Sequence, residues 1–150
     1  MISFRNNKGI TLFALSIYII VLMIILGILA TVSNFFNNNL EIIKQGARNA
    51  SSFDKFNVAF VSDVKNNKEA KIEGNIIAFE DGTIYTYNEI DKSIYRGKIK
   101  IADNVTYFLP TTKKILVDST AKQIINVNII IGESTNTVFN QNINYTLRYW

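Results

Sequence analysis

The distribution of apolar residues divides the chain into two parts of different character. No acidic or basic residue occurs from Gly9 to Leu40, and the stretch Ile10–Ala30 is almost continuously apolar. A helix of roughly 21 residues is about 31 Å long at 1.5 Å per residue, which matches the hydrocarbon core of a bilayer. This stretch therefore predicts a transmembrane helix.

Beyond this stretch, apolar residues recur at helical spacing. The pattern starts at Leu40 and includes Phe53, Phe56 and Phe60. Three- and four-residue spacing places such side chains on one face of a helix. We expect an amphipathic helix that continues to about Asn66 and buries these Phe residues.

After Glu69 the apolar pattern changes to a period of two, which is typical of strands. Asp81-Gly82 is a strong signal for a hairpin turn, and Pro110–Thr112 is predicted as another turn. The predicted fold is α+β, with a long N-terminal helix whose second half packs on a C-terminal antiparallel β-sheet. The candidate strands are Lys71–Glu80, Thr83–Asn88, Ser93–Ile101, Val105–Leu109, Lys114–Asp118, Ile124–Ile131 and Val138–Trp150.

Charges beside the apolar stretch predict its orientation. Arg5 and Lys8 precede it, and the charges that follow it nearly cancel. The positive-inside rule then places the N-terminus in the cytoplasm and the chain from Asn34 onwards outside. The run is longer than the apolar core of a secretory signal, and Ala30-Thr31-Val32 is a poor cleavage site, so we expect a retained, single-pass anchor in the cell membrane.

Composition excludes several classes of function. The chain has no Cys and no His, which removes disulfides, Cys- or His-based zinc sites, thiol nucleophiles and His-based triads. The net charge is +4, but Lys113-Lys114 is the only adjacent basic pair, so no nucleic-acid partner is indicated. The acidic residues near Glu80 and Glu89 lack the spacing of a calcium loop. We expect no cofactor, no metal and no enzymatic activity.

The junction before the apolar stretch carries a more specific pattern. In Asn7-Lys8-Gly9-Ile10-Thr11-Leu12, a short basic leader and a Gly directly precede the apolar residues. This resembles the cleavage and methylation motif of type IV prepilins and pseudopilins. The resemblance implies that a prepilin peptidase cuts between Gly9 and Ile10, and that Ile10 becomes the N-methylated first residue. It implies a leader at 1–9 containing Arg5 and Lys8, an assembly helix at 10–33, its amphipathic continuation at 34–66, and an external β-rich domain at 67–150.

The sequence departs from that family at one position. Pilins usually carry Glu as the fifth mature residue, where its carboxylate pairs with the amine of a neighbouring subunit; here that residue is Ala14. An unpaired carboxylate in a membrane is costly, so Ala14 eases insertion but removes this pairing. The replacement favours a minor pseudopilin over a major pilin.

The order of the remaining segments also resembles J-type minor pseudopilins and tip pilins. The matching segments are a helix end at Asp63–Asn66, the Asp81-Gly82 hairpin, Ile94–Arg96 and Asn104–Phe108. The resemblance implies a pilin-like fold and a structural role in a type IV pilus, a competence pseudopilus or a type II secretion filament. The implied partners are the prepilin peptidase, other pilins, the assembly platform protein with its ATPase, and membrane lipid.

Two alternatives stay open on the residues alone. The first is a signal-anchored membrane protein whose external β-rich module binds a partner unrelated to filaments. The second is an exported hydrolase, for which the sequence has no local signature.

Asp63 and Arg96 are interpreted as solvated surface charges rather than partners. Tyr85, Tyr87 and Tyr95 are interpreted as packing residues; the alternative is that they form a surface that binds DNA or a substrate.

Overall fold

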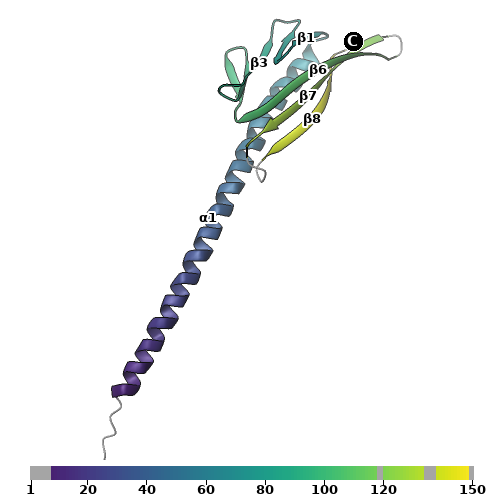
Figure 1. Ribbon diagram of the computed structural model, residues 1–150. Helices are drawn as coiled ribbons and strands as arrows, with labels where there is room; N and C mark the ends of the chain where they lie inside the picture. Colours follow the sequence, from purple (N-terminus) through teal and green to yellow (C-terminus); the bar gives the residue numbers. More distant parts are fainter. Residues whose placement is uncertain (1–7, 118–119, 134–137, 149–150) are drawn as a thin grey trace, which may run out of the picture. The chain divides into compact units, whose positions relative to one another are not determined.

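The computed structural model describes residues 8–117, 120–133 and 138–148 (Figure 1). By its internal contacts the chain forms two compact units, Met1–Glu41 and Ile42–Trp150. The elements in chain order are α1 (Lys8–Asn66), β1 (Ala70–Glu73), β2 (Ile76–Phe79), β3 (Ile84–Asn88), β4 (Ser93–Arg96), β5 (Ile99–Ala102), β6 (Val105–Val117), β7 (Thr120–Ile131) and β8 (Phe139–Thr146). The predicted α+β class is confirmed.

In the first unit, the described residues all belong to helix α1. Its large apolar side chains, from Leu12 to Leu40, are exposed on all sides of the helix. The hydroxyl groups of Ser16 and Thr31 donate to backbone oxygens one turn earlier, at 3.0 and 2.8 Å. Polar groups in an apolar segment are thereby satisfied within the helix itself, as a bilayer requires.

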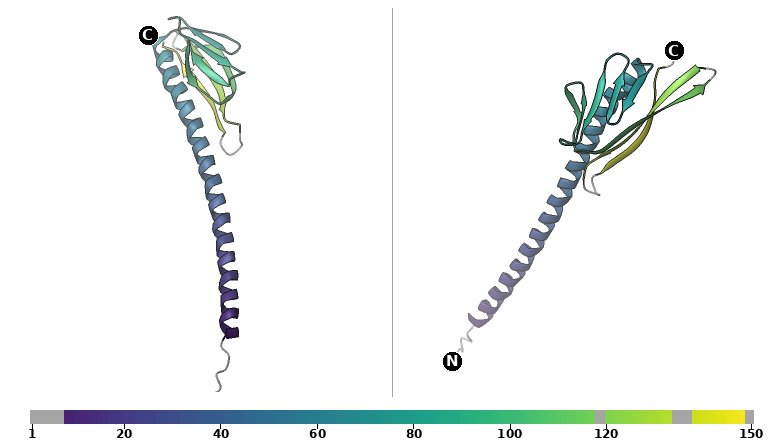
Figure 2. Two further views of the ribbon diagram at one scale, coloured as in Figure 1. Left: turned by 90° about the vertical axis from the view of Figure 1, so that its left-hand side faces the viewer. Right: turned by 45° about the horizontal axis from the view of Figure 1, so that its top comes forward.

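The second unit contains the C-terminal part of α1 and two antiparallel sheets. The five-stranded sheet has the order β1-β2-β3-β4-β5, and the three-stranded sheet has the order β6-β7-β8. The left-hand view of Figure 2 shows both sheets on the same side of this part of α1. The sequence-based prediction of one sheet is therefore wrong, because the strands form two sheets. A period of two shows which residues share a face of a strand, but not which strands pair.

The core of this unit forms where one stripe of α1 meets both sheets. Phe56 and Phe60 are fully buried, as predicted. The ring of Phe60 contacts Tyr85 of β3 at 5.1 Å and Tyr145 of β8 at 4.8 Å between centroids, both nearly edge to face. Phe56 contacts Phe108 of β6 in the same manner, at 6.0 Å. Edge-to-face pairs add to the stabilisation that burial alone provides, so this stripe joins the two sheets.

Two predicted strands are each divided by a glycine. Lys71–Glu80 forms β1 and β2 on either side of Gly74, and Ser93–Ile101 forms β4 and β5 on either side of Gly97. Both glycines have positive φ, 58° and 59°, a conformation that other residues adopt at a cost. The chain therefore reverses at each glycine instead of continuing as one strand.

The turn predicted at Pro110–Thr112 is also wrong, because these residues lie inside β6. Leu147 N–H donates to the carbonyl of Gln123 at 3.0 Å, so odd-numbered residues of β7 bond to β8 and even-numbered ones bond to β6. Pro110 is buried and stands opposite Val127, with its backbone nitrogen facing away from β7. Proline lacks an N–H, and at this position none is needed for the ladder.

The hairpin predicted at Asp81-Gly82 is present between β2 and β3. Gly82 has a φ of 86°, and its N–H donates to the carbonyl of Phe79 at 3.1 Å. The carboxylate of Asp81 accepts from the N–H of Thr83 at 2.8 Å. The last predicted strand matches β8, while Asp118 and Trp150 lie outside the described residues.

Candidate functional site

The predicted cleavage motif lies at the start of α1. Lys8, Gly9 and Ile10 are the first three residues of the helix, and Arg5 lies outside the described residues. The first turn of a helix has N–H groups without helical acceptors. Gly9 adds backbone freedom. The peptide bond between Gly9 and Ile10 therefore lies in the part of α1 that unwinds most easily.

The helix that follows this motif fits a membrane span. Among the described residues, α1 is the one helix long and apolar enough to cross a bilayer, and its most apolar window has no side chain buried within the protein. Ala14, the residue at the family's Glu position, is half-buried in this segment. A helix that is apolar on every side needs lipid or other helices around it. This part of the chain is compatible with a membrane anchor.

A buried ionic cluster lies at the other end of α1, and the sequence-based interpretation of its residues is wrong. Asp63 is buried and accepts two hydrogen bonds from Arg96 of β4, from Nε at 2.7 Å and from Nη2 at 2.9 Å. The hydroxyl of Tyr85 also donates to Asp63, at 2.6 Å. A bidentate guanidinium–carboxylate pair is both strong and directional. Asp63 and Arg96 are thus partners that fix the helix end to the five-stranded sheet.

The environment of this cluster changes the proton affinity of Tyr85 and Arg96. Burial, followed by the hydrogen bond to Asp63, raises the pKa of the Tyr85 phenol far above its usual value. The hydrogen bonds to Asp63 raise the pKa of Arg96. Both groups therefore keep their protons throughout the ordinary pH range, and neither acts as a base.

Tyr87 and Tyr95, the other two tyrosines considered for a ligand-binding surface, also form hydrogen bonds within the protein. Tyr87 is half-buried, and its hydroxyl donates to the carbonyl of Val105 at 2.9 Å. The hydroxyl of Tyr95 donates to the carboxylate of Asp91. Together with buried Tyr85, this arrangement favours packing over ligand binding for the three tyrosines.

Residues just after α1 fix the first hairpin. Asn67 is fully buried; its side chain donates to Asp81 at 3.0 Å and accepts from the Asp81 N–H at 3.1 Å. The N–H of Thr83 and then the Asn67 side chain lower the pKa of Asp81 by stabilising its carboxylate. This pairing sets where β1 begins relative to the β2–β3 turn.

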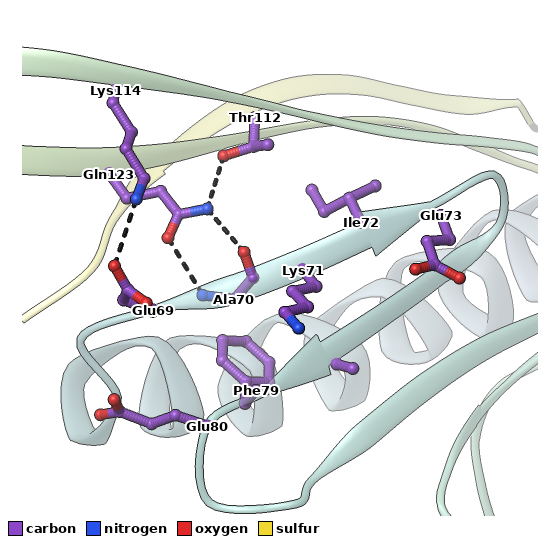
Figure 3. A pocket seen from close by; sticks show the side chains of 11 residues that line it. Glu69, Ala70, Lys71, Ile72, Glu73, Phe79, Glu80, Thr112, Lys114 and Gln123 are labelled. Carbon is purple, nitrogen blue, oxygen red and sulfur yellow. Dashed lines mark hydrogen bonds and ion pairs between the residues drawn. The ribbon is translucent and has the colours of Figure 1, made fainter.

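A groove of about 640 Å³ lies between β1 and the strands β6 and β7 (Figure 3). The buried side chain of Gln123 crosses one end of it and bonds to Ala70 twice. Its Oε1 accepts from the Ala70 N–H at 3.0 Å, and its Nε2 donates to the Ala70 carbonyl at 2.7 Å. Nε2 also donates to Thr112 Oγ1, at 2.8 Å. An exposed ion pair between Lys114 and Glu69, at 3.1 Å, lies at the same end.

The described residues contain no group of three His, Cys, Asp or Glu side chains that could hold a metal ion. Set against known protein families, curated proteins and solved structures, the chain has no match. Its function therefore has to be inferred from its own residues.

The groove and the ionic cluster were missed from the sequence because both depend on distant pairing. Gln123 and Ala70 are 53 residues apart, and Asp63 and Arg96 are 33 apart. A single Gln in a strand pattern gives no sign that its side chain will bond to another strand. For the cluster one signal existed, since Asp63 follows the buried stripe of Phe56 and Phe60 at helical spacing and so shares their face.

Proposed function

We propose that this chain is a minor pilin-like subunit of a filament of the type IV pilus, competence or type II secretion kind. The observation that carries the proposal is the junction Lys8-Gly9-Ile10 placed directly before an uncharged apolar helix. A peptidase at the cytoplasmic surface would remove residues 1–9 and leave the helix on the protein. A secretory signal cut after its apolar core would lose that helix.

The proposed role needs no chemistry from the chain itself. The helix first anchors the subunit in the bilayer and then packs among the helices of neighbouring subunits after extraction by the assembly platform and its ATPase. Gly27 and Ala30 lie one turn apart, and an added Cβ at Gly27 would meet no atom within 4 Å beyond the neighbouring residues and backbone of its own helix. Small residues allow helices to approach closely in a membrane or a filament core.

Ala14 supports a minor rather than a major subunit. A subunit at a filament tip has no earlier neighbour whose amine a Glu would pair with, so its loss costs nothing there. In a bulk subunit, every copy would lack one ionic contact with the next. Methylation of Ile10 is part of the same proposal.

The test is expression of the full chain in bacterial membranes with an active prepilin peptidase, followed by mass spectrometry of the extracted protein. We expect a mature chain that starts at Ile10, and an uncleaved chain when the peptidase carries an inactivating substitution. In a Gly9→Leu variant we expect cleavage to be blocked while membrane insertion stays intact. A chain that still starts at Met1 beside the active enzyme, or one cleaved after its apolar segment, would refute the proposal.

The second candidate is a membrane-anchored binding module unrelated to filaments. The groove beside β1 favours it, because a binding surface on the external unit needs no filament. Gly9→Leu separates the two candidates: the substitution would leave the location and activity of such a module unchanged.

A further inference from the structure

The hydrogen-bond register of β1 leaves half of its backbone groups facing away from the sheet. Glu80 N–H donates to the Glu69 carbonyl at 3.2 Å, and Lys71 stands opposite Ala78. Because bonded pairs alternate along an antiparallel ladder, Lys71 and Glu73 bond to β2. The N–H and C=O groups of Ala70 and Ile72 therefore point outwards, into the groove.

The outward-facing backbone groups of Ala70 and Ile72 differ in their hydrogen bonding. The groups of Ala70 are both bonded by the carboxamide of Gln123, which has the same donor and acceptor as a peptide group. Ile72 is the next residue of β1 whose backbone faces outwards, and its N–H and C=O groups have no partner among the described residues. The protein thus supplies a substitute peptide group at one ladder position and leaves the next position open.

The opposite wall of the groove is formed by Thr112, Lys114 and Gln123 of β6 and β7. The pairing of β6 with β7 uses odd-numbered residues of β6, so the backbone groups of Thr112 face away from β7. Side chains stand roughly perpendicular to a sheet, and Figure 3 shows the side chains of Thr112 and Lys114 extending towards β1, so the free backbone groups along the groove are those of Ile72. The volume of the groove, about 640 Å³, is within the range of sites that hold a small ligand or short peptide.

We infer that this groove binds a short extended peptide segment of another polypeptide, which adds as a strand along β1 next to Ile72. Backbone pairing would supply affinity, and the side chains beside the strand would supply selectivity. Ile72 and Phe79 favour an apolar residue on the inner side of the bound strand. Glu73 is exposed without an ion-pair partner among the described residues, and it favours a basic residue on the outer side. This inference stands whether or not the chain forms filaments.

The test is NMR titration of the full ¹⁵N-labelled chain in detergent micelles with the peptide acetyl-Thr-Val-Lys-Val-Thr-amide. The matched control peptide has the same sequence with N-methyl groups on its three central amides, which removes donors but keeps the side chains. We expect shifts of the amide signals of β1 and of Thr112 with the first peptide and none with its methylated twin. No shift at up to about 1 mM, the weak limit of specific binding, would overturn the inference. Equal binding of the methylated peptide would also overturn it.

Two variants of the protein and one control variant test the same site. Ile72→Pro removes the outward N–H without removing a bond to β2, and we expect it to abolish binding. Lys100→Pro places proline on β5, the other edge strand of the same sheet, and binding should persist. Glu73→Lys keeps the backbone intact, so it decides the question if Ile72→Pro does not fold; we expect about fivefold weaker binding. Unchanged binding in a folded Ile72→Pro, or in Glu73→Lys where the proline variant does not fold, would contradict strand addition at β1.

Discussion

Both parts of α1 carry large apolar side chains, more densely in the first part than in the second, but the surroundings of these side chains are opposite. In the first unit, Leu12 to Leu40 expose their apolar side chains on all sides of the helix. In the second unit, Phe53, Phe56 and Phe60 form one stripe and are buried against strands of the same chain. Hydrophobicity alone therefore does not define a core, because the distribution of apolar side chains around the helix decides whether it needs partners on all sides or on one side.

Substitution of matching residues in the two parts should produce the largest contrast. Phe60→Ala removes a fully buried ring that contacts both sheets, and we expect it to lower the free energy of unfolding of the second unit by about 3–5 kcal/mol. Phe35→Ala, at an exposed position of the first part, should change it by less than about 0.5 kcal/mol. Hydrogen exchange of the Ile125 and Ile129 amides, measured in micelles, reports this free energy. Similar losses in both variants would contradict the division into two units.

The buried ionic cluster distinguishes the end of α1 from its beginning. Arg96→Ala leaves the buried carboxylate of Asp63 with Tyr85 as its remaining side-chain donor, and we expect a loss of about 2–3 kcal/mol. This lies at the low end for a broken buried pair because Arg96 is partly open to water. Lys114→Ala breaks an exposed pair with Glu69 and should cost less than about 1 kcal/mol. Equal effects in urea unfolding would mean that the Asp63 pair is no stronger than a surface pair.

Alkaline pH should destabilise the second unit through its buried tyrosines. Burial raises the pKa of Tyr145 to about 12, above the usual value near 10, and also raises that of Tyr85. A group with a raised pKa in the folded state stabilises fully below its unfolded pKa and loses that contribution as pH rises through its folded pKa. Stability should therefore fall between pH 10 and 12, by about 1.4 kcal/mol per pH unit for each tyrosine.

Tyr145→Phe isolates the share of one residue in this pH effect. It keeps the buried ring but loses the bond from its hydroxyl to Asn57 and cannot ionise. The variant should be less stable at pH 8 and lose less stability between pH 10 and 12 than the wild type in urea unfolding. A parallel pH profile of the two proteins would show that Tyr145 does not ionise on unfolding in this range.

The sequence predicts features that depend on neighbouring residues, and it misses those that depend on distant pairing. The uncharged stretch, the Phe stripe of α1 and the Asp81-Gly82 hairpin are local patterns with direct physical meaning. The division into two sheets, the Asp63–Arg96 pair and the bonds of Gln123 to Ala70 need the strand order, which local periodicity does not contain. Pro110 shows the limit most clearly, because a residue that usually marks a turn lies within a strand.

A last pair of substitutions tests this explanation of Pro110. Its backbone nitrogen faces away from β7 and the residue is buried, so Pro110→Val adds an N–H that the ladder does not use and that lacks a partner; we expect a loss of about 1–2 kcal/mol in the free energy of unfolding. Val127, opposite Pro110 on the central strand β7, bonds to β8 through its N–H. The reciprocal change, Val127→Pro, should therefore cost about 3 kcal/mol or more. A large loss in Pro110→Val, or a small one in Val127→Pro, would mean that the register of the three-stranded sheet differs from the one described.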